Sequence, residues 1–191
     1  MKKVDYLFDR SSLLNINYQA LLDFKVSYLK LLEDNPFPIP PKSGSFYEMI
    51  KYLKRKDEAL PLKIGSYGNI TPFEAANRIA SDLVIINGLI QLVEKHKELK
   101  EATFTLRLGT THMVGNGDFT ISVNNEDMEG EAFNVAPSFL KPKLRSTKIK
   151  WNKSEELNSR LKYILVNEEA FEFIGTSKIN ERVFKVTNWH L

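Results

Sequence analysis

The chain has 191 residues, of which 42% are hydrophobic and 27% are charged, and its formal net charge is +3. This composition is that of a globular protein, and the length suits one domain, or one domain with a small additional lobe. The sequence contains no cysteine, which excludes zinc–thiolate sites, disulfide bonds and thiol nucleophiles.

Two features of the sequence concern its location in the cell. The N-terminal segment, MKKVDYLFDRSS, meets Asp5, Asp9 and Arg10 before any long apolar run, and this is not the pattern of a signal peptide. The most apolar stretch, Leu83–Val93, is too short to span a bilayer. We therefore predict a soluble, cytoplasmic protein that has no membrane partner.

The N-terminal part of the chain is predicted to be helical. Ser11–Asn35 offers a serine cap followed by apolar residues at helical spacing, and Phe46–Leu60 has the pattern of a shorter amphipathic helix. The proline-rich segment between them, Pro36–Ser45, cannot continue a helix and is predicted to be an extended connector. We divide the chain into an N-terminal helical region (1–60) and an α/β domain (61–191).

The α/β domain begins with a strong helix signal. Thr71–Glu74 reads TPFE, which combines a threonine cap, proline at the first helical position and glutamate at the third, and the helix is predicted to run to about Lys100. The hydrophobic period then changes from 3.6 to 2. Three strands are predicted within Ala102–Gly109, Asp118–Asn124 and Glu129–Val135, with a hairpin turn between the last two.

Further elements follow the hairpin. The basic segment Pro137–Lys153 is predicted to be helical after its first residues, with Pro142 tolerable only in the first turn. Arg160–Glu169 is predicted to be a buried strand, and the segments FEFIG and RVFKVTNWH a closing hairpin. From Thr71 onward the order is helix, strand, strand, strand, helix, strand. The predicted class is α/β (α+β), with a mixed central sheet flanked by helices.

Two acidic residues of the predicted hairpin are the candidate site. Counting outward from a symmetric turn over Asn124–Asp127 sets Thr120 opposite Glu131, which makes Asp118 and Glu131 diagonal neighbours on one face. A slip of one residue would place them on opposite faces. Two carboxylates so placed can share Mg²⁺ or Mn²⁺, which would lower the pKa of a bound water. The alternative is a structural ion pair between Glu131 and Arg107 or a lysine.

With these residues in place, the chain resembles the PD-(D/E)xK nuclease superfamily, the group that includes restriction endonucleases. The resemblance covers about residues 71–169 and rests on the order of elements, on Asp118 at the start of the second strand and on Glu131 in the third. It implies that both acids bind metal and that a lysine two residues after the glutamate orients the attacking water. Phe133 stands at that position here, so we expect Lys141 from the next helix to replace it, with Lys143 as the other candidate.

The resemblance also implies an acidic residue contributed by the first helix of the domain. Glu74 and Asp82 are the candidates, although Glu74 already has a role in the capping box. His112 lies in the loop ahead of Asp118, where it could contact a phosphate or make an ordinary loop hydrogen bond.

Basic residues cluster after the hairpin. Between Lys141 and Lys162 there is a local excess of about six positive charges, the kind of patch that neutralises phosphates. The alternative is a solvated, lysine-rich helix face. The residues expected to bind nucleic acid are Lys143, Arg145, Lys148, Lys150 and His112.

The leading prediction is a metal-dependent DNA endonuclease of the restriction or phage-defence type. Asp118, Glu131 and Lys141 would be catalytic, and double-strand cutting would suggest a homodimer. The first alternative is a catalytically inactive protein of the same fold that binds nucleic acid. The second is a protein-interaction module whose partner docks on the N-terminal helices.

Overall fold

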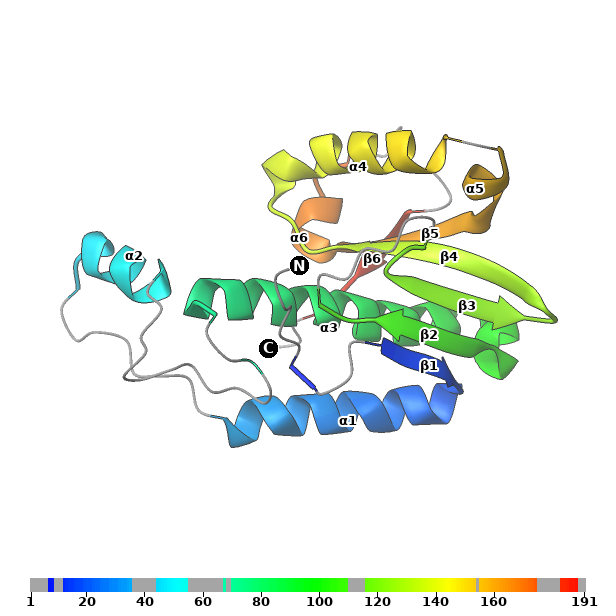
Figure 1. Cartoon of the computed structure of the whole chain (residues 1–191), viewed down its shortest axis with the longest axis horizontal. Coiled ribbons are helices and arrows are strands. Elements are labelled where there is room, and N and C mark those ends of the chain that lie inside the picture. The colour runs from blue at the N-terminus through cyan, green and yellow to red at the C-terminus, as the bar shows by residue number, and fades with distance from the viewer. Residues whose placement is uncertain are drawn as a thin grey trace.

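The computed structural model describes residues 7–8, 12–35, 44–54, 67, 70–109, 116–153, 155–174 and 183–188. Its elements in chain order are β1 (Ser12–Ile16), α1 (Tyr18–Asp34), α2 (Phe46–Lys54), α3 (Pro72–Lys95), η1 (Lys97–Glu101), β2 (Thr103–Arg107), β3 (Phe119–Val123), β4 (Glu126–Phe133), α4 (Pro137–Trp151), α5 (Glu155–Arg160), β5 (Leu161–Asn167), α6 (Glu168–Phe171) and β6 (Val183–Val186). The helices cover both faces of the sheet, with α1 and α3 on one face and α4 on the other (Figure 1).

The six strands form one mixed sheet in the order β1-β2-β3-β4-β5-β6. The pairs β1–β2, β2–β3 and β3–β4 are antiparallel, whereas β4–β5 and β5–β6 are parallel. This architecture confirms the predicted class. The predicted order from Thr71 is also confirmed as α3, β2, β3, β4, α4 and β5, with the short helices η1 and α5 inserted.

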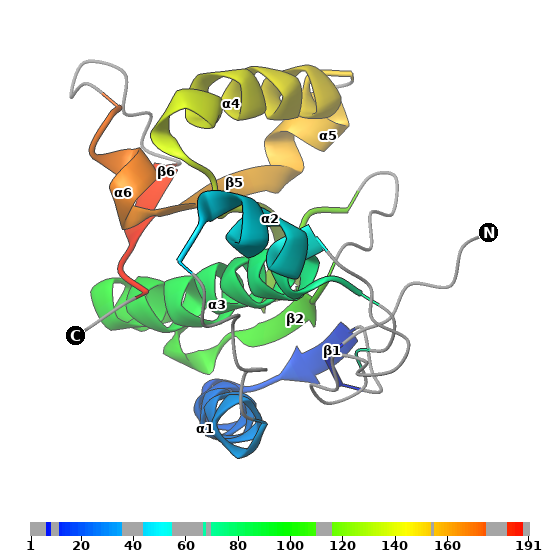
Figure 2. The same ribbon diagram turned by 90° about the vertical axis from the view of Figure 1, so that its left-hand side faces the viewer.

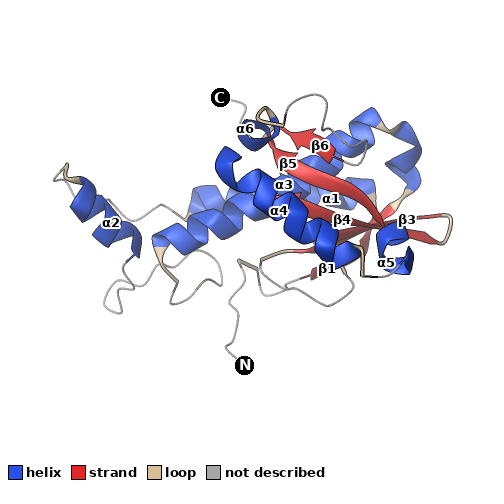
Figure 3. Cartoon of the chain, turned by 90° about the horizontal axis from the view of Figure 1, so that it is seen from above, coloured by secondary structure: helices blue, strands red, loops and turns tan. Residues whose placement is uncertain are grey.

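Alternation along the strands divides the buried side chains into two hydrophobic clusters, one on each face of the sheet. The cluster under α3 and α1 includes Leu21, Tyr28, Ile86, Leu89, Phe104, Leu106, Phe119, Ile121, Leu165 and Val186. The cluster under α4 and α6 consists of Phe133, Leu140, Trp151, Leu161, Ile164, Val166 and Ala170. Figure 3, which is seen from above, shows the strands passing beneath α4.

The start of α3 is as predicted. The backbone N–H of Glu74 donates to the Thr71 hydroxyl oxygen over 3.1 Å, and proline occupies the first helical turn. The helix ends at Lys95, five residues before the predicted Lys100, and η1 follows it. Gly88 lets β5 approach closely, since a Cβ there would lie 2.6 Å from Cδ1 of Leu165.

α3 is the one helix within the described residues that is long and apolar enough to cross a membrane. However, 61% of its most apolar window is buried inside the structure, against the sheet and α1. The burial of α3 is that of a helix in the core of the protein.

The prediction of a single helix over Ser11–Asn35 is wrong for its first part. Residues 12–16 form β1, which pairs with β2, and the helix begins at Tyr18 with Asn17 as its cap. The side chains of this segment alternate as in a strand. Leu13 packs against the core, whereas its neighbour Leu14 is 68% exposed. Residues 12–35 therefore share one sheet and one core with the α/β domain.

The predicted C-terminal hairpin is also wrong. Phe171 ends α6, which begins at Glu168 within the predicted strand Arg160–Glu169, and β6 adds to β5 in parallel. Gln91 of α3 fixes the end of β6 by exchanging two hydrogen bonds with the backbone of Thr187. Pro142 lies inside α4, beyond its first turn, contrary to the prediction.

α2 (Phe46–Lys54) lies within the second predicted helix and stands apart from the sheet (Figure 1). It packs against α3, and Figure 2 shows it beside the first part of that helix. Its Tyr52 is buried, while Lys54 places its ammonium group 4.0 Å from the ring centroid of Phe73 in α3. Residues 55–60 of the predicted helix lie outside the described part of the chain.

Candidate functional site

The turn between β3 and β4 sets the register of the candidate site. Asn124 and Asn125 have positive φ angles of 51° and 66°, as in a two-residue type I′ turn. Thr120 therefore pairs with Glu129. The predicted pairing of Thr120 with Glu131 is wrong by two residues, because it assumed a symmetric turn of four residues.

The strand start at Asp118 is irregular. The backbone N–H of Asp118 donates to the Gly130 carbonyl over 2.8 Å, although the register pairs Gly130 with Phe119. Two residues of one strand thus oppose a single residue of the other, as in a β-bulge. The Asp118 carboxylate accepts a hydrogen bond from the backbone N–H of Ala132 over 2.8 Å. Asp118 therefore contacts both chain neighbours of Glu131.

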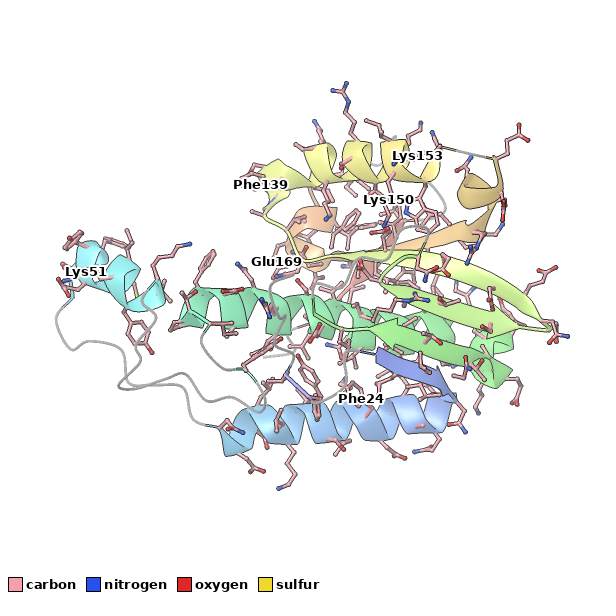
Figure 4. The ribbon with its side chains drawn as sticks, viewed as in Figure 1. Phe24, Lys51, Phe139, Lys150, Lys153 and Glu169 are labelled. Carbon is pink, nitrogen blue, oxygen red and sulfur yellow. The ribbon has the colours of Figure 1, made fainter. Side chains whose placement is uncertain are left out.

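The carboxylate of Glu131 points toward α4 and is almost fully buried, with 4% of the residue exposed. Its Oε1 accepts a hydrogen bond from Nζ of Lys150 over 2.6 Å and another from Nε1 of Trp151 over 2.8 Å. Figure 4 shows Lys150 between α4 and the sheet. The structure therefore contains the predicted alternative, a structural ion pair, with a lysine that comes from α4.

The Asp118 carboxylate also lies within electrostatic range of Asp82. Its negative charge contributes to the raised pKa of Asp82, a residue of α3, which covers the opposite face of the sheet from α4. The structure thus brings Asp118 next to both chain neighbours of Glu131, while the Glu131 carboxylate is bound by Lys150 and Trp151 of α4.

These contacts do not fit a divalent cation shared by Asp118 and Glu131. The ammonium group of Lys150 already sits 2.6 Å from Oε1 of Glu131, and it would repel a second cation there. Within the described residues, no three His, Asp or Glu side chains come together as a metal-binding group. The assignment of both acids as ligands of Mg²⁺ or Mn²⁺ stays a prediction.

A second buried acid on β4 was not among the predicted site residues. Glu129 is 1% exposed, and its two oxygens accept hydrogen bonds from Arg107, Arg160, Thr120 and the backbone of Gly117. Two guanidinium groups compensate the cost of burying this charge. Glu129 therefore ties β2, α5 and the turn before β3 together. The signal in the sequence is the alternation Glu129-Gly130-Glu131, which places both glutamates on the face under α4.

The predicted basic residues lie on different sides of α4. This helix carries five basic residues and no acidic one. Lys141, Arg145 and Lys148 are exposed, whereas Lys150 turns inward to Glu131. Lys143 places its ammonium group 5.4 Å from the ring centroid of Phe133. Lys143 therefore contacts Phe133, the residue at the position where the PD-(D/E)xK resemblance implies a lysine. Lys141, the predicted replacement, points outward.

Two further predicted site residues remain. Glu74 lies in the first turn of α3, where its carboxylate pairs with Arg78 over 2.6 Å and its backbone N–H donates to the Thr71 cap. His112 lies outside the described residues.

Asp82, the other acidic candidate in α3, is buried with 1% exposed. Its oxygens accept hydrogen bonds from the Tyr28 hydroxyl over 3.0 Å and from the backbone N–H of Gly109 over 2.8 Å. Burial raises the pKa of Asp82 to about 6, although both hydrogen bonds and the nearby Arg78 lower it. The Asp82 carboxylate therefore joins α1, α3 and the end of β2.

Comparisons with family models, curated proteins and solved structures gave no significant match. The resemblance to the PD-(D/E)xK superfamily therefore continues to rest on the order of elements and on the residues of the β3–β4 hairpin.

Proposed function

We propose that this protein binds nucleic acid through the outer surface of α4. This corresponds to the first alternative from the sequence, a catalytically inactive protein that binds nucleic acid. The observation that carries this proposal is the charge of α4, which has five basic residues and no acidic residue over 15 positions. Lys141, Arg145 and Lys148 are all exposed. Their spacing of four and three residues aligns them along one side of the helix.

Such a row of cations suits a polyphosphate backbone. Each lysine or arginine that contacts a phosphate releases a condensed counterion, so that binding weakens with added salt. Glu131 is satisfied by Lys150 and Trp151, and Glu129 by two arginines. The acids beneath α4 are therefore neutralised within the protein and do not oppose the approach of a phosphate.

The test is a fluorescence anisotropy titration with labelled DNA over a series of salt concentrations. With duplex DNA we expect log K to fall with log salt with a slope of roughly −3.6 to −4.5, as for four or five phosphate contacts. Replacing Lys141, Arg145 and Lys148 by glutamine should lower the magnitude of the slope by about three. The control replaces Lys30, Lys97 and Lys100, which are exposed on other elements, and removes the same charge. An equal effect of the two triple variants would overturn the proposal.

The second candidate function is the metal-dependent DNA endonuclease, and one observation favours it. Lys150 brings an ammonium group to Glu131, beside the strand in which Phe133 replaces the expected lysine. We propose that Lys150 would then take the role predicted for Lys141. Cleavage would use Mg²⁺ or Mn²⁺, and binding of such an ion by Glu131 would require Lys150 to withdraw from the carboxylate.

Cleavage is tested with supercoiled and linear DNA in Mg²⁺ and in Mn²⁺. Asp118→Asn keeps an oxygen for the Ala132 N–H and should abolish cleavage while the protein remains folded. If the Asp118→Asn variant still cleaved DNA, the endonuclease proposal would be rejected. Calorimetric titration with Mn²⁺ gives a second readout, because a site without catalytic function should bind none.

We also propose a protein partner for the N-terminal helices. A protein partner on the N-terminal helices gains support from α2, whose apolar side chains Phe46, Tyr47 and Ile50 are 89%, 68% and 57% exposed. We further propose that the protein is a homodimer and that it is cytoplasmic.

A further inference from the structure

Two parallel stripes of side chains run along the outer surface of α4. Phe139, Pro142, Ser146 and Ile149 follow one another at intervals of three or four residues, which places them on one side of the helix. Phe139 is 66% exposed and Ile149 61% exposed. We call this row, which has three apolar residues and Ser146 between the last two of them, the apolar stripe. It runs over eleven residues, or about 15 Å along the helix axis.

The basic stripe, formed by Lys141, Arg145 and Lys148, lies directly beside it. Lys141 and Arg145 line a shallow hollow together with three residues of the apolar stripe, namely Pro142, Ser146 and Ile149. The hollow thus has apolar side chains and cationic groups within the same few ångströms of surface.

From this arrangement we propose that α4 binds single-stranded nucleic acid in preference to duplex. The proposal rests on the proposed nucleic-acid binding and specifies its substrate class. In a single strand the faces of the bases are free to stack on aromatic and apolar side chains, while the phosphates follow a row of positive charge. The apolar stripe would contact the bases, and the basic stripe would contact the phosphates.

A duplex fits the same surface less well. A helix that reads the major groove of DNA needs polar side chains toward the base edges. The apolar stripe of α4 instead presents Phe139, Pro142 and Ile149. In a duplex the faces of the bases are stacked on each other, so these three side chains would lose water without gaining a partner. A second copy of α4 is also a poor occupant, because two helices with five basic residues each would repel.

The test compares one labelled 20-nucleotide strand with its own duplex at the same salt concentration. We expect the wild-type protein to bind the single strand at least about tenfold more tightly. Phe139→Ala should weaken single-strand binding by about fivefold to a hundredfold, the range found for loss of one stacked base, and leave duplex binding unchanged. Lys148→Gln should weaken both by a similar factor. The matched control is Phe173→Ala, because Phe173 is 70% exposed in the turn after α6, and it should change neither.

The outcomes separate this inference from the proposed function. Equal or tighter binding of the duplex, or an equal loss for both substrates in Phe139→Ala, overturns the preference for single strands and leaves nucleic-acid binding in place. Absence of binding to either substrate at low salt overturns both. Vesicles that contain anionic lipid provide a third arm. Phe139-dependent binding to vesicles, without binding to either oligonucleotide, would assign the stripes to a membrane surface and overturn both proposals.

Discussion

The ammonium group of Lys150 lies 2.6 Å from Oε1 of Glu131, and the indole N–H of Trp151 donates to the same oxygen. Glu131 is buried in the sheet, whereas both donors belong to the last residues of α4. The C-terminal end of α4 is therefore attached to β4 by a charged contact in addition to its apolar packing.

Loss of this contact should destabilise the protein. Lys150→Met leaves the Glu131 charge with one neutral donor, and we expect the free energy of unfolding to fall by about 1–2 kcal/mol, less than for a fully buried pair because Lys150 is 36% exposed. Urea denaturation measures the change. Lys148→Met, on the exposed side of the same helix, should stay within about 0.5 kcal/mol. The double variant Glu131→Gln with Lys150→Met should recover part of the loss, and strictly additive effects would contradict this account.

The pair between Arg107 and Glu129 is more deeply buried, with 14% and 1% of the side chains exposed. Arg107→Met removes one of the two guanidinium groups that compensate Glu129, and it should cost about 2–4 kcal/mol in thermal or urea unfolding. The control is Lys30→Met in α1, because the pair of Lys30 with Asp34 is 72% and 60% exposed and should contribute less than about 1 kcal/mol. Similar losses in the two variants would show that burial does not decide the strength of these pairs.

Asp82 should make stability depend on pH in the acidic range. Its pKa is raised from 3.8 to about 6 in the folded protein, chiefly by burial. The folded state therefore binds the Asp82 proton more tightly than the unfolded state, and this group contributes stability that is present at low pH and lost as pH rises through about 6. Between pH 5 and pH 7 the loss should be about 1 kcal/mol.

Asp82→Asn isolates this contribution from those of the other titrating groups. The difference in unfolding free energy between the wild type and Asp82→Asn, measured at several pH values in urea, should change by that amount from pH 5 to pH 7. The free energy of unfolding of Asp82→Asn should increase relative to that of the wild type as pH rises. A constant difference, or a change of opposite sign, would show that Asp82 does not titrate in this range.

Gly130 is the position in β4 that faces the ring of Phe119. A Cβ at this position would overlap the ring atoms of Phe119, which is fully buried. Gly130→Ala should therefore lower the free energy of unfolding by about 1–3 kcal/mol, the usual cost of overpacking. Gly44→Ala is the matched control, because a Cβ at Gly44 meets no atom within 4 Å. Thermal unfolding of the two variants provides the comparison, and an unchanged Gly130→Ala would place the ring elsewhere.

Local signals predicted much of the fold. The cap at Thr71 and the proline after it give the start of α3, and the alternation of Phe104 with Leu106 gives β2. Such signals depend on a few adjacent residues and are not altered by the rest of the chain. The position of Ser12–Ile16 in the sheet depends instead on its pairing with β2, and its apolar spacing suits a helix as well as a strand.

The contacts of the candidate site depended on distances that the sequence does not contain. The register shift came from two residues, Asn124 and Asn125, that adopt positive φ and shorten the turn. The alternation of β4 placed Glu129 and Glu131 on one face correctly. The alternation of β4 does not determine the rotation of α4 about its own axis. That rotation decides that Lys150 reaches Glu131 and that Lys141 faces outward.

The parallel addition of β6 has a consequence for the order in which the fold is completed. β6 follows every other described element along the chain, yet Val186 belongs to the cluster under α3 and Gln91 binds the backbone of Thr187. During synthesis, α3 and β5 are made well before residues 183–188 leave the ribosome. Until then an apolar strip of α3 and an unpaired strand edge remain uncovered, which is the kind of surface that chaperones bind and that aggregation exploits.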